Sequence, residues 1–281
     1  MRQIFTPGRI EEITRSYGVT KTEVIWIIEG VSGRPFYHLL LDGHLPTNLE
    51  ERIYEILSRR KEGVPLPYLG FPVSFMGLEI DVPEGVFIPR PETEVLVEKV
   101  FDLFPDRGKP LYFVDVGIGS GAIALAILRE YRNAVGIGID ISRKALVAAS
   151  LNARRLSIDR LHLILGDCLE AIRNSPEGFD LIVSNPPYVS IDEYEGLQKE
   201  VKMEPRRALI GGRDGVLYHR KILKEASRLL APKGVVVMEM APHQEEMVLE
   251  LARSLSFSAE TFKDLEGRVR GVVAFRRRDS L

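Results

Sequence analysis

The second half of the chain alternates short, nearly continuous apolar runs with longer segments in which apolar residues recur every three or four positions. The apolar runs predict strands buried on both faces, at Leu111–Val116, Ala134–Ile139, Leu161–Leu165, Asp180–Ser184 and Gly234–Met240. The periodic segments between them predict helices at Ala122–Tyr131, Arg143–Leu156, Cys168–Arg173 and Val216–Leu230. Strands and helices that alternate in this way form a parallel sheet covered by helices on both faces.

The pattern changes toward the C-terminus. A helix is predicted near Gln244–Leu255, and two further strands follow at Ser258–Lys263 and Val269–Arg276. Only a few residues around Gly267 separate these strands, which predicts an antiparallel hairpin. The predicted fold class is therefore α/β, with five parallel strands and an antiparallel C-terminal hairpin in one seven-stranded sheet. This plan differs from the six-stranded parallel sheet of dinucleotide-binding domains.

Residues 1–65 predict a small helical domain without catalytic residue types. Thr6 stands before Pro7 as a helix N-cap. Thr20–Glu23 and Thr47–Glu50 each fit a capping box, in which Thr and the Glu three residues later satisfy backbone N–H groups of the first turn. Two roles stay open for this domain: docking of a macromolecule, or stability.

Residues 66–90 are rich in proline and glycine and contain two short apolar runs. This composition predicts a β-hairpin linker between the helical domain and the α/β domain, which spans residues 91–281.

Composition narrows the class of protein. Lys and Arg (38) nearly balance Asp and Glu (40), for a net charge of -2, which argues against stable nucleic acid binding. The single cysteine, Cys168, excludes internal disulfides and a cysteine-based zinc cluster, and no metal is expected. Neither a membrane span nor a signal peptide is predicted, so we expect a cytoplasmic protein, and a monomer.

The first predicted strand runs into a glycine-rich turn that suits a nucleotide-like cofactor. The turn and its approach contain Asp115, Gly117, Ile118, Gly119, Ser120 and Gly121. Glycine lets the backbone turn tightly and approach a ligand without a Cβ in the way. Asp140 closes the second strand about twenty residues on, where a carboxylate can accept from two ribose hydroxyls. These residues alone do not separate NAD from S-adenosylmethionine.

Two details favour S-adenosylmethionine. Asp115 is predicted inside the turn, where its charge repels a pyrophosphate but attracts a ligand with an ammonium and a sulfonium group. Asp167 follows the third strand and can accept from an adenine amino group. Cys168 is interpreted as a small buried residue that lines the adenine slot. Successive strand ends then supply contacts along the rim where ligands bind in open α/β sheets.

Asn185, Pro186, Pro187 and Tyr188 follow the fourth predicted strand. The two prolines donate no N–H and fix φ, so the chain forms a stiff corner here. The side-chain oxygen of Asn185 and the Pro186 carbonyl are two acceptors suited to an –NH2 group, and Tyr188 offers a flat apolar face. The corner therefore predicts a site for a planar amide or amine. A proline-stiffened turn with a capping Asn is the structural alternative.

The chemistry expected at this corner is a methyl transfer. A methyl group on a sulfonium is already activated, so its transfer needs in-line approach rather than a metal or a covalent step. An amide nitrogen is a poor nucleophile because its lone pair is delocalised. Acceptors at Asn185 Oδ1 and Pro186 O hold its N–H bonds and favour the positive charge that builds on nitrogen. Asn185, Pro186 and Tyr188 are the candidate catalytic residues, and together with Pro187 they form the candidate substrate site.

Five motifs, taken in order, resemble the HemK/PrmC protein-glutamine methyltransferases. They are Phe87–Glu94, Asp115–Ala124, Ser184–Val189, Glu204–Gly215 and Asp264–Arg270. The resemblance runs from about residue 65 to the end and implies the class I S-adenosylmethionine-dependent methyltransferase sheet with an N-terminal helical domain. It also implies methyl transfer to the side-chain nitrogen (N5) of the glutamine in the Gly-Gly-Gln motif of peptide chain release factors. The cofactor product would be S-adenosylhomocysteine.

The resemblance also implies which residues contact the cofactor. Carried over by position, they are Gly117 to Gly121, Asp140, Ile141, Asp167, Cys168 and Asn185, with Phe87, Pro89, Arg90 and Glu92 at the methionine end. Two alternatives stay open: methylation of an exocyclic amine of adenine or guanine in nucleic acid, and binding of S-adenosylmethionine or NAD without methyl transfer. The charge balance and the lack of a base-recognition domain disfavour the first, and an idle Asn185 corner disfavours the second.

Overall fold

The computed structural model describes residues 6–42, 45–173 and 177–276. The chain divides into two compact units. The helical unit contains Met1–Phe71 together with the segment Lys199–Met203, and the sheet unit contains Pro72–Gln198 and Glu204–Leu281. Within the described ranges, no helix is long and apolar enough to cross a membrane.

The sheet unit is built on one mixed sheet. Its strands are β3 (Leu111–Val116), β4 (Ala134–Asp140), β5 (Leu161–Leu165), β6 (Phe179–Ser184), β7 (Leu230–Glu239), β8 (Phe257–Lys263) and β9 (Val269–Arg276). They run in the order β5-β4-β3-β6-β7-β9-β8. The first five strands in this order, β5, β4, β3, β6 and β7, are parallel to one another. β9 is antiparallel to both of its neighbours, β7 and β8. The predicted seven-stranded plan is confirmed.

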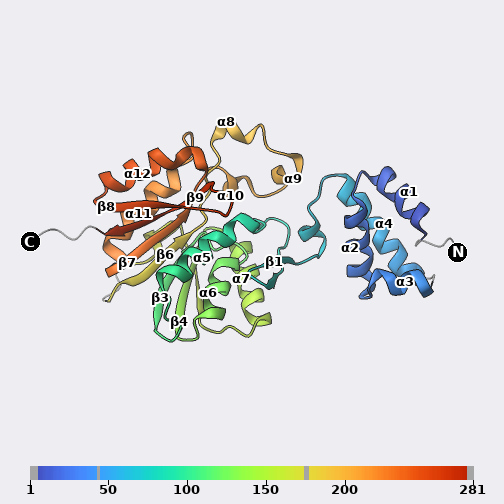
Figure 1. The fold of residues 1–281 in the computed structure, drawn as a ribbon, viewed down its shortest axis with the longest axis horizontal. Coiled ribbons are helices and arrows are strands. Elements are labelled where there is room, and N and C mark those ends of the chain that lie inside the picture. The colour runs from blue at the N-terminus through green and yellow to red at the C-terminus, as the bar shows by residue number, and fades with distance from the viewer. Residues whose placement is uncertain (1–5, 43–44, 174–176, 277–281) are drawn as a thin grey trace, which may run out of the picture. The chain divides into compact units, whose positions relative to one another are not determined.

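Helices cover both faces of this sheet. Figure 1 shows α5 (Glu94–Leu103), α6 (Ala122–Glu130) and α7 (Arg143–Arg155) on one face, and α11 (Leu217–Leu229) and α12 (Glu245–Ser254) on the other. The buried residues of α11 recur every three or four positions, at His219, Ile222, Leu223, Ala226 and Leu229. This spacing places one apolar stripe against the sheet.

Short elements connect the strands and helices of this unit. They are the hairpin β1 (Val73–Phe75) and β2 (Leu78–Ile80), the 3-10 turns η2 (Pro91–Thr93), η3 (Cys168–Ala171) and η4 (Pro242–Gln244), and the helices α8 (Ile191–Tyr194) and α10 (Arg206–Leu209). The β1–β2 pair is antiparallel, with Phe75 opposite Leu78, so the predicted hairpin is present.

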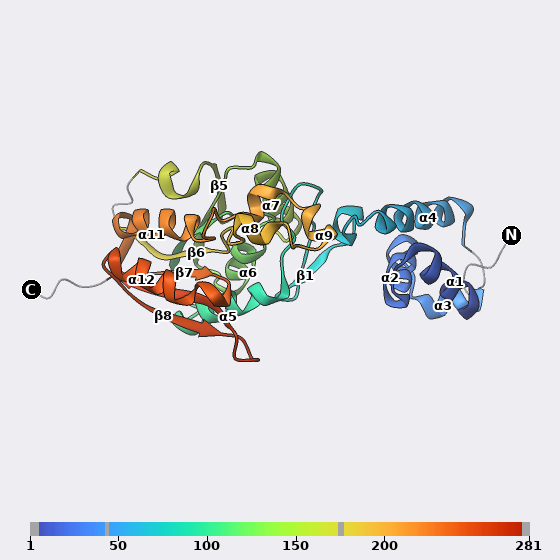
Figure 2. The ribbon, with the colours of Figure 1, turned by 90° about the horizontal axis from the view of Figure 1, so that it is seen from above.

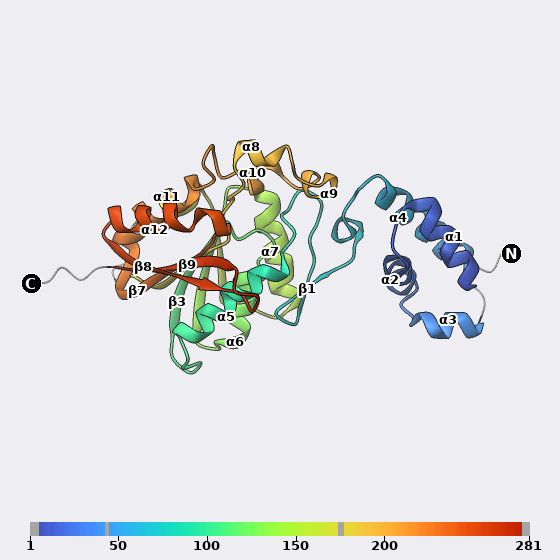
Figure 3. The same cartoon turned by 45° about the horizontal axis from the view of Figure 1, so that its top comes forward.

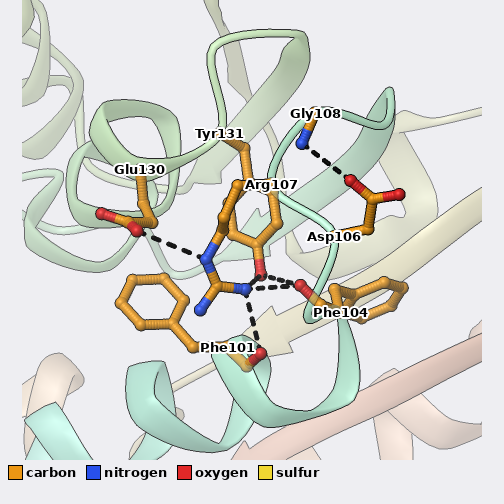
Figure 4. Close-up of polar contacts among 7 residues, drawn as sticks. All are labelled: Phe101, Phe104, Asp106, Arg107, Gly108, Glu130 and Tyr131. Carbon is orange, nitrogen blue, oxygen red and sulfur yellow. Dashed lines mark hydrogen bonds and ion pairs between the residues drawn. The ribbon is translucent and has the colours of Figure 1, made fainter.

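Arg107 holds the connection between α5 and β3 (Figure 4). Its guanidinium lies 4.6 Å from the ring centroid of Phe101 and 4.7 Å from that of Tyr131. Arg107 Nη1 donates to the Phe101 carbonyl at 2.9 Å, to the Phe104 carbonyl and to the Tyr131 hydroxyl. Arg107 Nε also pairs with Glu130 at 3.3 Å. One side chain therefore joins the C-terminal ends of α5 and α6.

The helical unit contains α1 (Pro7–Tyr17), α2 (Lys21–Ser32), α3 (Phe36–Asp42), α4 (Thr47–Lys61), the 3-10 turn η1 (Leu66–Leu69) and α9 (Lys199–Lys202). Figure 2 shows α4 alongside α1, α2 and α3. Their inward faces form one apolar core, which includes Ile10, Ile13, Ile27, Ile53 and Leu57. Arg60 of α4 ties α9 to this core, because Nε pairs with Glu23 at 2.9 Å and Nη1 pairs with Glu200 at 2.8 Å.

Two of the three helix starts predicted in this unit are confirmed. Thr6 accepts from Arg9 N as an N-cap, and Thr20 and Glu23 form a capping box. The predicted box at Thr47 is wrong. Thr47 is already helical, and Pro46 is the N-cap residue, without a side-chain hydrogen bond. The ring of Pro46 fixes its φ at -56°, and the helix begins at the next residue, Thr47, without a capping side chain.

Candidate active site

The corner Asn185–Tyr188 directly follows β6, as the sequence predicts. Ser184 Oγ donates to the Val116 carbonyl at 2.7 Å, which ties the end of β6 to the end of β3, where the glycine-rich turn begins. Gln244 Nε2 donates to the Tyr188 carbonyl at 2.8 Å, so this oxygen already has a partner. The corner and the turn are therefore held at the same edge of the sheet.

The segment Glu204–Gly215 braces the corner. Figure 3 shows α8 and α10 along the upper edge of the sheet unit. Val189 N donates to the Leu209 carbonyl at 2.9 Å, and Gly211 N donates to the Val189 carbonyl at 2.8 Å. A Cβ at Gly211 would lie 2.5 Å from the Pro187 carbonyl oxygen, so only glycine allows this close approach. Sequence reasoning did not find these contacts, because the partners of the segment are remote in the sequence.

The side chain of Asn185 has a defined orientation. Asn185 Nδ2 donates to Thr93 Oγ1 at 3.0 Å. Thr93 is the last residue of η2 and is 3% exposed. Because the nitrogen is directed to Thr93, the oxygen Oδ1 is the end available to a ligand. Thr93 lies in a motif quoted above, but nothing in its local sequence indicates this contact.

Tyr188 contacts a buried carboxylate that sequence reasoning missed. Its hydroxyl donates to Glu239 Oε1 at 3.2 Å. Glu239 is the last residue of β7 and is 4% exposed; its burial raises the pKa to about 7. Burial, and then the Glu239 charge, also raise the pKa of Tyr188. An acidic residue directly after the apolar run Val235–Met238 is the signal that could have indicated this position.

The glycine-rich turn and Asp140 lie together. Gly117 has a φ of 73°, and a Cβ added there would meet nothing within 4 Å among the described residues. Asp140 accepts from Gly119 N at 3.0 Å through Oδ2 and from Ser142 N at 2.8 Å through Oδ1. Burial raises the pKa of Asp140. Each carboxylate oxygen keeps a lone pair, so acceptance from ribose hydroxyls remains open to it.

Asp115 differs from its prediction. It lies in β3, whose bounds are those that the sequence predicts, and not in the turn to which its charge was assigned. It is 1% exposed, Oδ2 accepts from Ala124 N at 3.2 Å, and Oδ1 has no hydrogen-bond partner among the described residues. Burial raises the pKa of Asp115 to about 7. A buried carboxylate with an unused oxygen fits a ligand that brings a positive charge.

Asp167 is the N-cap residue of η3, and Cys168 is its first residue, after β5. Asp167 Oδ2 pairs with Lys221 Nζ at 2.7 Å, and this bond lowers the pKa of Asp167. Sequence reasoning missed Lys221. Cys168 is 9% exposed, and burial raises the pKa of its thiol to about 12, so the thiol is neutral. A neutral buried thiol is consistent with the lining role that the sequence suggests for Cys168.

The side chain of Arg90 contacts the protein itself. It pairs with Glu204, whose side chain is 1% exposed, and lies 5.1 Å from the ring centroid of Phe87. Glu204 Oε2 also accepts from Ile88 N at 2.9 Å. These contacts fix the segment that contains Phe87, Pro89, Arg90 and Glu92. The guanidinium is therefore held by a buried carboxylate.

Residues 109–269 match a family model described as a methyltransferase domain. A solved methyltransferase from Pyrococcus furiosus shares the fold, with a TM-score of 0.53 and 19% identity over 82% of this chain and 98% of that chain. The fold and the matched domain define the class as a methyltransferase.

The relatives narrow the class to a family. The release factor glutamine methyltransferase of Moorella thermoacetica is 36% identical over 88% of this chain and 87% of its own length. That of Gloeobacter violaceus is 35% identical over 93% of this chain and 92% of its own length. The chain belongs to the release factor glutamine methyltransferases. The family that the five motifs resemble is thereby confirmed.

Proposed function

We propose that this protein transfers a methyl group from S-adenosylmethionine to the side-chain nitrogen (N5) of the glutamine in the Gly-Gly-Gln motif of peptide chain release factors. Membership of the family supports this substrate. The single observation that carries the chemistry is the orientation of Asn185, whose nitrogen donates to Thr93 and whose oxygen is left for a substrate amide.

The residues at the turn fit this cofactor. The unpartnered Oδ1 of Asp115 suits a ligand with positive charge, and the open space beside Gly117 leaves room for close backbone contact. Asp140 would accept from the ribose, and Asp167 and Cys168 would lie at the adenine. Ile141 is exposed beside Asp140, where it offers an apolar contact. We assign no metal to the reaction.

The bound cofactor supplies a methyl group activated by its sulfonium. The protein then has to position the nucleophile. Asn185 Oδ1 and the Pro186 carbonyl accept the two N–H bonds of the glutamine, which fixes the nitrogen and favours the positive charge that develops on it. Pro187 keeps the corner rigid, and the ring of Tyr188 packs beside the carboxamide. The proton leaves to solvent after the transfer, so no general base is required.

We further propose that the helical unit docks the release factor. Four large apolar side chains of α2 and α3 are exposed: Trp26 (57%), Tyr37 (61%), Leu40 (45%) and Leu41 (83%). Large exposed aromatic and aliphatic side chains are typical anchors of protein interfaces. The protein then acts as a cytoplasmic monomer on a protein substrate, without stable nucleic acid binding.

Methyl-labelled S-adenosylmethionine tests the activity. The protein is incubated with a release factor, with the same factor carrying Asn in place of the motif glutamine, and with total RNA. We expect label only in the unchanged factor, because the shorter Asn side chain cannot place its nitrogen at the same point. Label in RNA alone, or equal label in both factors, would overturn the proposed substrate.

A further inference from the structure

Two buried polar side chains lie next to Asn185 and have no role in the function proposed above. Thr93 is 3% exposed and Glu239 is 4% exposed. They come from different elements, since Thr93 ends η2 and Glu239 ends β7. Buried polar groups cost free energy unless they are hydrogen-bonded, so their partners indicate what they do.

Polar contacts link these side chains to Asn185 and Tyr188. Asn185 Nδ2 donates to Thr93 Oγ1 at 3.0 Å, and Thr93 lies close enough to Glu239 to lower the pKa of that carboxyl as a hydrogen-bond donor does. Glu239 Oε1 accepts from the Tyr188 hydroxyl at 3.2 Å. Glu239 Oε2 has no close partner among the described residues, so the carboxylate has acceptor capacity to spare for the Thr93 proton.

The single proton of the Thr93 hydroxyl decides which way the Asn185 amide faces. If the proton is directed to Glu239, Thr93 offers only lone pairs to Asn185 and selects Nδ2 as its partner. If the proton were directed to Asn185, it would select Oδ1, and Nδ2 would then face the –NH2 group of the substrate. Two donors would face each other, and the substrate would be repelled. An anionic Glu239 favours the first arrangement.

We propose, on the basis of the function proposed above, that Thr93 and Glu239 are positioning residues that turn Asn185 Oδ1 toward the substrate amide. Neither residue touches the reacting atoms. Both act through Asn185, whose oxygen is thereby oriented before the substrate arrives, so that no reorganisation is needed during transfer.

The sheet makes this arrangement rigid. β6 and β7 are parallel neighbours, and Ser184 lies opposite Met238 in their register. Asn185 and Glu239 follow these two residues directly, at the tips of adjacent strands. Side chains carried by regular elements are held more firmly than those on loops, which suits a positioning function.

A matched set of variants tests the hydroxyl. Thr93→Val keeps the shape of the side chain but removes the proton and the acceptor, and Thr93→Ser keeps both. We expect kcat to fall about tenfold or more in Thr93→Val, because a hydrogen bond worth about 1.4 kcal/mol no longer separates the two amide orientations. Thr93→Ser should restore kcat to within about threefold, and the Kd for S-adenosylmethionine should change less than about threefold in both.

Two further variants complete the set. Glu239→Gln should lower kcat in the same way, because its new –NH2 group can donate to Thr93 and redirect the hydroxyl proton. Thr261→Val is the control. Thr261, in β8, donates through Oγ1 to Glu245 Oε1 at 2.8 Å. This bond is similar but lies outside the site, so its loss should leave kcat unchanged. Full activity of Thr93→Val, or a Thr93→Ser as weak as Thr93→Val, would overturn the proposal.

A second measurement needs no substrate and so separates this proposal from the proposed function. The chain has five asparagines, and Asn185→Ala assigns the side-chain –NH2 signal of Asn185 in protein labelled with 15N-asparagine and saturated with S-adenosylhomocysteine. We expect proton exchange of this group to become about tenfold faster in Thr93→Val. An unchanged signal would refute the positioning role, even in a protein that methylates release factors. A release factor left unlabelled by the wild type would refute the proposed function alone.

Discussion

A carboxamide has two ends of almost the same shape, and at residue 185 the protein distinguishes them. The nitrogen is used inside the protein, on Thr93, and the oxygen is left for the substrate. The glutamine to be methylated is itself a carboxamide, so the enzyme has to present acceptors to its –NH2 group. One well-placed hydroxyl therefore determines whether the corner attracts or repels its substrate.

Replacing Asn185 by Ala removes one of the two acceptors. We expect kcat for release factor methylation to fall by about 10²- to 10³-fold, which is the usual cost of losing one preorganised polar contact to the transition state. The Kd for S-adenosylmethionine, measured by titration calorimetry, should rise less than about tenfold. A variant that folds normally and keeps wild-type kcat would refute the role of Asn185.

The pH dependence of kcat should report Glu239. Burial raises its pKa from an ordinary 4.5 to about 7, with Glu92 adding to the shift and Arg270, Thr93 and Tyr188 opposing it. Above pH 7 the carboxylate accepts the Thr93 proton. As the pH falls through 7, Glu239 becomes protonated and no longer favours donation by the Thr93 hydroxyl. The preferred orientation of the Asn185 amide is then lost, and kcat should fall.

This profile is measured with saturating cofactor and release factor, between about pH 5.5 and 8.5, on either side of the raised pKa of Glu239. Asp115 titrates in the same range, but its effect belongs to cofactor affinity and should appear in the KM for S-adenosylmethionine. Thr93→Val should flatten the kcat profile, because it has no hydroxyl to redirect. A wild-type kcat that stays constant through pH 7 would contradict the role of the Glu239 anion.

At the scale of elements, the alternation of apolar runs and periodic segments was sufficient to predict the sheet. Burial on both faces selects continuous apolar runs, and these mark β3, β4, β5 and β6 to within a residue at each end. β7 begins four residues earlier than predicted, at Leu230 rather than Gly234, because Leu230 pairs with Phe179 before a register shift that precedes the pair of Val235 with Leu181.

The residues of the site were predicted only where local sequence fixes them. Asn185 and Asp140 directly follow or end strands, so their position could be predicted. Thr93 could not, because its partner Asn185 is 92 positions away, and no local pattern encodes that distance. Lys221 was missed for the same reason: it lies 54 positions from Asp167 on a helix face that reads as solvent-exposed.

The connection between α5 and β3 should depend strongly on Arg107. Arg107→Ala removes the donor of the Phe101 carbonyl and of the Tyr131 hydroxyl, while the Phe104 carbonyl keeps Tyr131 OH as a donor at 2.6 Å, so the free energy of unfolding should fall by about 2 kcal/mol. Urea denaturation measures this loss. Lys109→Ala is the control, since its ion pair is exposed and should contribute less than about 0.5 kcal/mol. Cofactor affinity should not change in either variant, and a loss as small as that of the control would contradict the structural role of Arg107.

At the scale of the whole molecule, each of the two units is made of segments that are not continuous in the sequence. The segment Lys199–Met203 belongs to the helical unit although the residues on both sides of it belong to the sheet unit. Glu200 is held there by Arg60, whose side chain is 15% exposed and also pairs with Glu23. The segment Lys199–Met203 is thus anchored among the N-terminal helices.

Arg60→Ala should release this segment. Two carboxylates lose their shared partner, so we expect the free energy of unfolding to fall by about 1 to 3 kcal/mol and limited proteolysis to become faster within residues 196–205. Arg52→Ala, which removes an exposed pair with Glu55, is the matched control and should change neither. Cleavage at the same rate in wild type and Arg60→Ala would show that the ion pairs do not anchor the segment.

The assignment of Lys199–Met203 to the helical unit also affects how truncated forms of this enzyme can be interpreted. A fragment that starts at Pro72 would keep every residue of the methyl-transfer centre, yet it would carry a stretch whose packing partners had been cut away. Loss of turnover in such a fragment could then result from unfolding of the segment Lys199–Met203 as readily as from loss of substrate docking by the helical unit. The helical residues also hold the segment Lys199–Met203, so point substitutions on their exposed side chains are the better way to test what they recognise.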